Sequence, residues 1–490
     1  MSAFDLLVVW ILPAVGLAIF LAGAWLNAVM LFGWAQWVRD ARDQGRHVSV
    51  LPLVPGVIGA IAMWNGPFDW MRGFFWLPLL LDVGCIPYIV MGVLASRAEV
   101  DAGAEKLAQE EAGAEMAAAM AESAKAKLRC REYLPSLAGC LLGTAVGDAL
   151  GLPYEGLSPR RRARLFPEMD KYHLLPFGRG MCSDDTEHTI MVAQALLETA
   201  AFAKSSRDAE AFRSKLACGM RLWLLGLPAG IGMATLKGIL KLWLFLPQRW
   251  LGTFSAGNAP SMRSALIGVY WAEDTELLRE HVRAATRLTH SDPKAEYAAL
   301  AVALAASLSA NSAGPVDASE YARQLRAFLG GDGAELAALM DGVAKSVQAG
   351  ESTPAFAQGM RLEKGVTGYA FHTVPVALHA WLAHPGNYRE AVLAAVECGG
   401  DTDTVAAITG AVAGAGKGPG GIPPDWLRTL AEWPHTVQWM EGLAQSLAEV
   451  RSNYAGPRTI AAPVLKLGVR NLFFLAVVLL HGFRRMLPPY

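Results

Sequence analysis

Several patterns that would place this chain in a common class are missing from its sequence. The six cysteines include no C-x-x-C pair, which argues against a disulfide framework or a zinc site and favours reduced thiols. The formal net charge is only −1, so there is no broad basic surface to suggest a nucleic-acid partner. Residues 134–454 contain no convincing run of alternating β-branched residues, which leaves an all-α core as the prediction.

What the chain has in excess is apolar sequence near its N-terminus. Hydrophobic residues make up 53% of the chain. Three stretches, residues 4–32, 48–64 and 74–95, approach the roughly 20 apolar residues that a bilayer span requires. The first five residues carry no Lys or Arg, so the leading run is a poor cleavable signal peptide. We therefore expect about three transmembrane helices within residues 1–96.

The basic residues between these stretches predict their orientation. The first loop carries Arg39, Arg42 and Arg46, the second carries only Arg72, and the segment after residue 95 carries many more. Positive charge is retained on the cytoplasmic side of a membrane. We therefore expect a multi-pass protein of the inner (cell) membrane, with the N-terminus outside and everything after residue 95 in the cytoplasm.

Composition divides the remaining chain into three segments. Residues 97–132 are rich in Ala, Glu and Lys without proline, which is typical of an exposed helical linker. Residues 133–455 show Ala/Leu segments at helical spacing and predict a compact all-α domain. Residues 456–490 contain a short apolar run between basic residues, which suits a helix lying on the cytoplasmic leaflet or a packed terminal helix.

The most concentrated polar chemistry follows a Gly-Gly pair. Asp401 and Asp403 stand two residues apart in the motif GGDTDT, and small apolar residues continue behind them. The pattern predicts a buried helix whose first turn carries both acids, where unpaired N–H groups favour negative charge. Two acids so close repel each other unless a cation lies between them, and Mg²⁺ or Mn²⁺ prefers such oxygen ligands. Taken alone, the stretch also fits a helix cap at Asp401 with a solvated Asp403.

Four other polar stretches accompany this motif in the central domain. They read GDALGLPYEG, SDDT, SAGNAPSMR and THSD, and begin at Gly147, Ser183, Ser255 and Thr289. Each also has an ordinary structural interpretation, such as a helix cap, a surface ion pair or a histidine satisfied within the fold. Together they supply five carboxylates and at least two hydroxyls, a donor set that suits two hard cations. The small residues ahead of Arg263 suit a phosphate group.

In this order, the motifs resemble those of the ADP-ribosylglycohydrolase family, which includes the dinitrogenase-reductase-activating glycohydrolase. The resemblance covers roughly residues 137–426, and GGDTDT with its small-residue helix is the most specific element. It implies an all-α, orthogonal helical bundle with a dinuclear metal site that holds two divalent cations, Mg²⁺ or Mn²⁺. One departure is Ala259, which stands where a glycine is usual in the family; an alanine there would weaken binding if the backbone required positive φ.

The resemblance also implies roles for individual residues. The metal ligands would be Ser183, Asp184, Asp185, Asp401, Asp403 and Thr404. The contacts to ADP-ribose would come from Gly257, Asn258, Ser261, Met262, Arg263 and His290. Glu155 would lie close to the metals and the scissile bond, so Glu155 or Asp403 is expected to move the proton during hydrolysis at the anomeric carbon.

These implications predict a membrane-anchored hydrolase that removes ADP-ribose from a modified protein or a small acceptor. The linkage cleaved, whether to arginine, serine or another acceptor, stays open at this point, as does the choice between Mg²⁺ and Mn²⁺. The alternative is a membrane-tethered sensor that binds ADP-ribose without hydrolysing it. The complete set of acids argues against that alternative.

Overall fold

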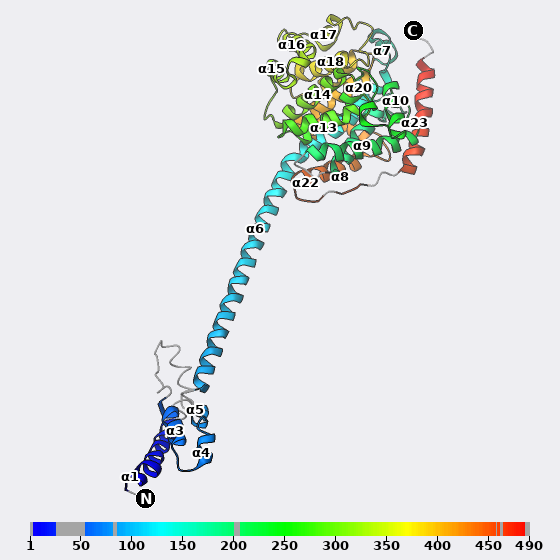
Figure 1. Cartoon of the computed structure of the whole chain (residues 1–490). Coiled ribbons are helices and arrows are strands. Elements are labelled where there is room, and N and C mark those ends of the chain that lie inside the picture. Colours follow the sequence, from blue (N-terminus) through cyan, green and yellow to red (C-terminus); the bar gives the residue numbers. More distant parts are fainter. Residues whose placement is uncertain are drawn as a thin grey trace. The chain divides into compact units, whose positions relative to one another are not determined.

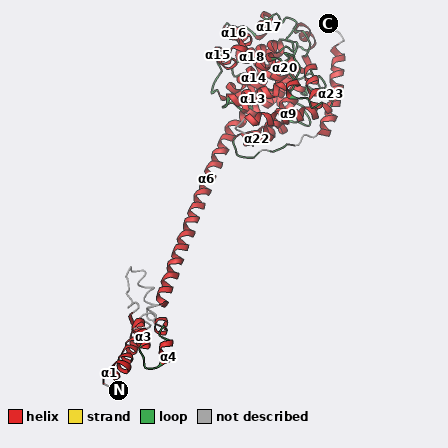
Figure 2. Ribbon diagram, viewed as in Figure 1, coloured by secondary structure: helices red, strands yellow, loops and turns green. Residues whose placement is uncertain are grey.

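The protein is all-helical, in agreement with the class predicted from its sequence. The computed structural model describes residues 3–25, 54–81, 86–199, 206–456, 458–460 and 464–485. Within these ranges there are helices, turns and isolated β-bridges but no β-strand (Figure 2). By their internal contacts the residues divide into two compact units, Met1–Met120 and Ala121–Tyr490.

The first unit contains a helical stretch, Phe4–Trp25, with the length and apolar content of a membrane span. Its large apolar side chains are mostly exposed, as a helix surrounded by lipid would require. A shorter apolar helix, α3 (Val54–Trp64), is followed by the short helices α4 (Asp69–Gly73) and α5 (Leu77–Leu81). Parts of all three predicted spans, residues 26–32, 48–53 and 82–85, lie outside the described residues.

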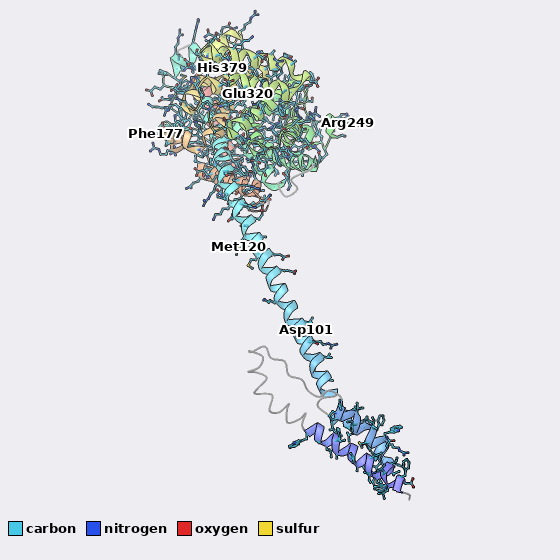
Figure 3. The ribbon with its side chains drawn as sticks, turned by 90° about the vertical axis from the view of Figure 1, so that its left-hand side faces the viewer. Asp101, Met120, Phe177, Arg249, Glu320 and His379 are labelled. Atoms are coloured by element: carbon cyan, nitrogen blue, oxygen red, sulfur yellow. The ribbon has the colours of Figure 1, made fainter. Side chains whose placement is uncertain are left out.

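Helix α6 (Ile86–Gly151) contains the whole segment for which a helical linker was predicted. Asp101 and Met120 are exposed along it (Figure 3). The predicted domain start at residue 133 is not a break in the backbone, because α6 continues through Pro135. Proline removes only one backbone hydrogen bond, and the turns after it are buried from Leu137 onward, so packing in the second unit holds the helix together there.

The core of the second unit is formed around α14 (Pro293–Asn311), α18 (Ala370–Ala383) and α20 (Thr402–Lys417) (Figure 1). All three helices are buried along most of their lengths. Alanine is frequent in α14, and alanine and glycine are frequent in α20, so neighbouring helices can approach them closely. Other helices of this unit are α7 (Pro159–Leu165), α8 (Asp184–Thr199), α9 (Ser206–Leu225), α10 (Met233–Trp243), α11 (Ala259–Met262), α12 (Ala265–Tyr270), α13 (Thr275–Arg287), α15 (Ala318–Leu329), α16 (Ala334–Gln348), α17 (Thr353–Gly359), α19 (Tyr388–Glu397), α21 (Pro424–Thr429), α22 (Val437–Arg451) and α23 (Val464–Arg485).

Two further helical stretches of the described residues have the length and apolar content of a span, Glu111–Tyr154 and Lys466–Arg485. The first is the C-terminal part of α6 with the 3-10 turn Leu152–Tyr154 that follows it, and its apolar window is mostly buried inside the protein, so its apolar residues serve the core. The second lies within α23, most of whose large apolar residues are exposed. Composition alone therefore does not separate a span from a core helix in this chain.

The end of α6 crosses α20 at very short range because glycines line the crossing. Gly139, Gly143, Gly147 and Gly151 recur every four residues, so they share one face of α6. A Cβ atom at any of the four would lie 2.1–2.3 Å from a backbone oxygen of α20. Only glycine permits this approach, which brings the acids at the end of α6 next to those at the start of α20.

Gly143→Ala should force this crossing apart and destabilise the protein. Overpacking a tight core contact typically costs about 1–3 kcal/mol, and here the obstacle is backbone, which cannot move aside as a side chain can. The matched control is Gly342→Ala on α16, where a Cβ would meet no atom within 4 Å. Denaturant unfolding of the full chain in detergent should show a loss for the first variant and none for the second. Equal stability of the two variants would contradict the requirement for glycine at the crossing of α6 and α20.

Candidate active site

The two acids of the GGDTDT motif are held at the start of α20 by a fixed turn. Gly399 and Gly400 have φ values of 69° and 82°, a left-handed conformation that favours glycine. The backbone N–H of Gly400 donates to Leu157, and that of Asp401 donates to Val366, each over 2.9 Å. Helix α20 then begins one residue later, as predicted, with Asp403 buried in its first turn.

The side chain of Asp401 does not cap this helix. Asp401 occupies the N-cap position, but its carboxylate accepts no capping hydrogen bond from a backbone N–H of the first turn. It accepts one instead from Asn258 Nδ2, over 2.5 Å, and the same amide nitrogen donates to Thr373 over 2.9 Å. The simple reading of Asp401 as a helix cap is therefore wrong, and the SAGNAPSMR motif lies directly against the GGDTDT motif.

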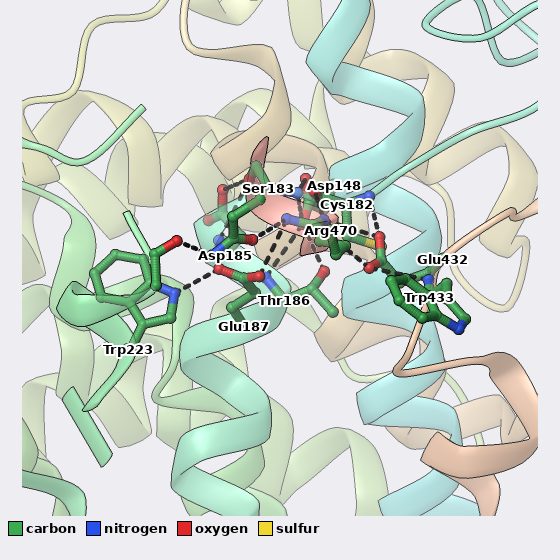
Figure 4. Close-up of polar contacts among 12 residues, drawn as sticks. Asp148, Cys182, Ser183, Asp185, Thr186, Glu187, Trp223, Glu432, Trp433 and Arg470 are labelled. Atoms are coloured by element: carbon green, nitrogen blue, oxygen red, sulfur yellow. Dashed lines mark hydrogen bonds and ion pairs between the residues drawn. The ribbon is translucent and has the colours of Figure 1, made fainter. Parts of the chain in front are cut away.

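The SDDT motif forms the start of α8, which is held by an acid from α6. Asp148 accepts hydrogen bonds from the backbone N–H of Ser183 over 2.9 Å and from the hydroxyl of Thr186 over 2.5 Å. Figure 4 shows these contacts converging on the Asp148 carboxylate. Asp148 therefore caps α8 from outside the helix, which leaves Asp184 and Asp185 free of that task.

The two acidic motifs meet in space although they are far apart in the chain. Oδ2 of Asp185 accepts hydrogen bonds from Ser183 Oγ over 3.1 Å and from Thr404 Oγ1 over 3.3 Å, and Thr404 lies 219 residues away. The other oxygen, Oδ1 of Asp185, is buried without a hydrogen-bond partner, and so is Oδ1 of Asp403. A buried carboxylate oxygen without a partner is costly, so both atoms mark a place where a positively charged group would be stabilised.

Electrostatic repulsion dominates this cluster. Within the described residues, no Lys or Arg forms an ion pair with Asp148, Asp184, Asp185, Asp401 or Asp403. Burial raises the pKa of the Asp184 and Asp185 carboxyls well above the usual range, and the charge of Asp148 raises both further. Burial likewise raises the pKa of Asp403, followed by the charge of Glu155. Such a group of acids must either hold protons or bind cations.

Glu155 lies at the rim of the cluster, just after the end of α6. The residue is exposed, yet nearby protein atoms exclude enough water to raise the pKa of its carboxyl, and the charge of Asp401 raises it further. A carboxyl with a raised pKa can hold a proton closer to neutral pH than a free glutamate can. Glu155 therefore has the position and the electrostatics of a group that exchanges protons.

The residues fit hard cations by donor type. All six of the predicted ligands offer oxygen, four of them are aspartates with raised pKa, and two carboxylate oxygens are unpartnered. Among the described residues, however, no group of three or more His, Cys, Asp or Glu side chains has the arrangement of a formed metal site. The structure thus brings the predicted ligands into one cluster without defining the coordination of an ion.

The residues predicted to contact ADP-ribose divide into two groups. Gly257 and Asn258 are partly exposed beside Asp401, and His290 packs so closely on Gly257 that its Nε2 would lie 2.9 Å from a Cβ there. Burial lowers the pKa of His290 to about 3, so its ring is neutral. Ser261, Met262 and Arg263 are buried behind them.

The guanidinium of Arg263 is bonded to the protein itself. It donates to Thr289 Oγ1 over 2.7 Å and to the carbonyl oxygen of Ala285 over 3.0 Å, and it lies 3.0 Å from His188 Nδ1. Ala259, where the family pattern has glycine, begins α11 and is not among the residues with positive φ. The strain that an alanine was expected to cause at this position is therefore absent.

Sequence reasoning missed the support that α23 gives to the SDDT motif. Arg470 is buried and forms ion pairs with Glu187 over 3.1 Å and with Glu432 over 3.0 Å. It also donates to the carbonyl oxygen of Cys182 over 2.5 Å, while Glu432 accepts from the N–H of Cys182 over 2.8 Å (Figure 4). These bonds fix the backbone of Cys182, two residues before Asp184, and the side chain of Glu187, three residues after it. The signal in the sequence was one arginine inside an apolar run, where charge is expensive unless paired.

Known proteins resemble most of the second unit. A sequence model of the ADP-ribosylglycohydrolase family matches residues 130–456. An uncharacterized protein of Archaeoglobus fulgidus is 31% identical, over 64% of this chain and 95% of that protein. An ADP-ribosylhydrolase of Gallus gallus is 26% identical, over 68% and 99%. The ADP-ribosyl-[dinitrogen reductase] glycohydrolase of Rhodospirillum rubrum is 25% identical, over 60% and 89%. All the acids of the cluster lie inside the matched range, whereas α23 lies outside it.

Arg470→Met should destabilise the protein by about 3–5 kcal/mol, because Glu187 and Glu432 would remain buried without a counter-charge. The matched control is Arg458→Met, since the Arg458 side chain is 42% exposed and its partner Glu449 is partly exposed. Surface pairs of that kind contribute only about 0–1 kcal/mol. The measurement is the free energy of unfolding of each full-length variant. A loss at Arg470 no greater than that at Arg458 would show that the buried pairs do not support the site.

Without divalent cations, the protein should lose stability as the pH rises. An aspartate in an unfolded chain has a pKa of about 3.9, whereas burial raises the pKa of Asp148 to about 6. The folded state therefore keeps protons that the unfolded state releases in this window, and its stability falls as pH increases. Mn²⁺ should reduce this loss, because a bound cation replaces the protons.

The measurement is the unfolding midpoint in a chelator at about pH 5 and about pH 7.5, with and without added Mn²⁺. Asp148→Asn is the control, since it removes one titrating group while keeping a side-chain oxygen for Ser183 and Thr186, and it should reduce the dependence of stability on pH. If stability in the chelator increased steadily with pH, the folded state could not be holding extra protons on its buried aspartates.

Proposed function

The chain belongs to the ADP-ribosylglycohydrolase family, and we propose that it hydrolyses ADP-ribosyl linkages as a membrane-anchored, two-metal enzyme. The observation that carries this proposal is the contact between Asp185 and Thr404, which joins two acidic motifs in a buried cluster. A cluster of acids of this kind suits chemistry in which positive charge develops or is bound.

The metals would be held between α8 and α20. Ser183, Asp184 and Asp185 would bind from the side of α8, and Asp401, Asp403 and Thr404 from the side of α20. Two divalent cations, Mg²⁺ or Mn²⁺, would supply positive charge to the ribose hydroxyls and to the attacking water. The raised pKa values of the acids support this role. A buried carboxyl with a raised pKa is costly to ionise, and a bound cation stabilises its ionised form.

Glu155 is the proposed proton-transfer group, with Asp403 as the other candidate. The bond between the anomeric carbon and its acceptor breaks through an oxocarbenium-like state, so the departing group needs a proton and the incoming water must lose one. Glu155 has a raised pKa and stands at the exposed rim, where an acceptor protein could reach it. Asn258 would help by holding Asp401 in place through its amide.

The proposed ADP-ribose site adjoins the acids. Gly257, Asn258 and His290 would contact the ligand directly. Ser261, Met262 and Arg263 are buried immediately behind them, and we assign them to the inner side of the same site. Arg263 would contribute positive charge from that position rather than a bidentate contact at the surface.

The proposed partner is an ADP-ribosylated protein or another ADP-ribose conjugate. The Rhodospirillum rubrum relative is named for its action on ADP-ribosylated dinitrogen reductase, which supports a protein substrate. The proposed location is the inner membrane, with the second unit in the cytoplasm. The exposed apolar residues of Phe4–Trp25 support the membrane location, and the basic residues that follow the predicted spans support the orientation.

Asp403→Ala should abolish turnover and remove one of two bound metal ions. Asp403 is proposed both as a metal ligand and as a candidate proton-transfer group, and the substitution deletes its carboxylate. The control is Asp332→Ala, which removes an exposed acid of the same type elsewhere in the second unit. Release of ADP-ribose from arginine- and serine-linked substrates, with and without Mg²⁺ or Mn²⁺, gives the rate, and metal analysis gives the stoichiometry.

Full activity of the Asp403→Ala variant would remove the mechanism. Binding of ADP-ribose by the unmodified chain, without release from any conjugate in either metal, would favour the non-hydrolytic sensor instead. The two conjugates also separate the arginine and serine linkages, which share the same ribose chemistry.

A further inference from the structure

Helix α23 turns its polar residues toward the protein. Besides the buried Arg470, Asn471 donates to the carbonyl oxygen of Gly226 over 2.9 Å, and Nε2 of His481 lies 2.9 Å from that of Pro153. Arg485, at the end of the helix, donates to the carbonyl oxygen of Glu155. These contacts recur over four turns on one face, so they fix the rotation of α23 about its own axis.

The opposite face of α23 is consequently apolar and exposed. Leu472, Phe473, Leu479, Leu480 and Phe483 are each 55–73% exposed. A helix on the surface of a water-soluble domain normally shows the reverse pattern, with its apolar stripe against the core. A continuous exposed apolar face of this kind marks an interaction surface.

The apolar surface continues from α23 onto the end of α9. The hydrogen bond between Asn471 and Gly226 places the two elements side by side, and Leu222, Leu225 and Leu227 around that glycine are also exposed. Between them lies a mainly apolar cavity of about 370 Å³, lined by residues of both helices. The surface is therefore wider than a single helix.

We infer that this surface, the outward face of α23 together with Leu222, Leu225 and Leu227, rests on the lipid bilayer. Exposed Lys466 and Arg484 flank the apolar stretch of α23, an arrangement that suits insertion among anionic headgroups. The same chain carries the exposed apolar helix Phe4–Trp25, so a bilayer is available to it. The inference rests on the proposed membrane anchoring, and it adds a second, peripheral attachment made by the catalytic unit itself.

The position of α23 also determines where the active site would bind its substrate. His481 and Arg485 bond to the backbone of Pro153 and Glu155, so the C-terminal end of α23 adjoins the rim of the candidate active site. With α23 on the bilayer, that rim lies close to the headgroups. The substrates that fit this arrangement are ADP-ribosylated proteins attached to the same membrane.

The test is a depth measurement on the full chain reconstituted in vesicles of phosphatidylcholine and phosphatidylglycerol. Leu480→Cys, in a Cys218→Ser background, carries an environment-sensitive fluorophore, and doxyl-labelled lipid acts as the quencher. The matched control is Ala338→Cys, an exposed position on α16. We expect several-fold stronger quenching at 480 than at 338, after subtraction of the signal from the Cys218→Ser parent.

Equal quenching at the two positions would overturn the inference. So would a label at 480 that is shielded from iodide only as protein concentration rises, since this would identify a second copy of the chain as the occupant. A third label, at Leu12→Cys in the first unit, separates this outcome from failure of the anchor. Quenching at 12 without quenching at 480 would leave the anchoring intact, whereas the absence of quenching at both would remove both proposals.

Discussion

The structure depends on keeping several carboxylates close together in a buried place. Asp148, Asp184, Asp185, Asp401 and Asp403 repel one another, and within the described residues no basic side chain pairs with them. Two devices hold them against this repulsion. The glycine-lined crossing of α6 and α20 brings their backbones together, and the turn at Gly399 and Gly400 aims the start of α20 at α8. The fold therefore maintains an unfavourable charge arrangement that a bound cation would make favourable.

The same unit contains a second group of buried acids, which, unlike the first group, is paired with a basic side chain. Glu187 and Glu432 share Arg470, and Trp223 donates a further hydrogen bond to Glu187. These acids are satisfied by the protein and serve to fix the backbone around the SDDT motif. The contrast distinguishes acids with a structural role from acids that remain available for chemistry, even though both kinds lie within a few residues of each other on α8.

Part of this organisation could be predicted from the sequence. The helix that begins after Asp401, the all-α class and the proximity of the SDDT and GGDTDT motifs all follow from local patterns and from the family resemblance. The role of Arg470 could not be predicted, because one arginine between apolar residues resembles the flank of a surface helix until its two partners are known. The continuation of α6 through Pro135 also depends on tertiary packing, which overrides the local preference of proline. The sequence predicted a helix on the cytoplasmic leaflet or a packed terminal helix, but not which face of α23 is exposed, because that follows from the burial of Arg470.

The three-way contact of Arg470 with Glu187 and Glu432 has an evolutionary consequence. These residues come from three separate segments, and one of them lies beyond the range that the family model matches. Loss of Arg470 alone would leave the negative charges of Glu187 and Glu432 buried without a counter-charge. Loss of either glutamate alone would leave the buried guanidinium with only one carboxylate partner. A lineage that discards the C-terminal helix can therefore do so only if neutral residues replace both acids at about the same time. The three positions are expected to be inherited, or lost, as a set.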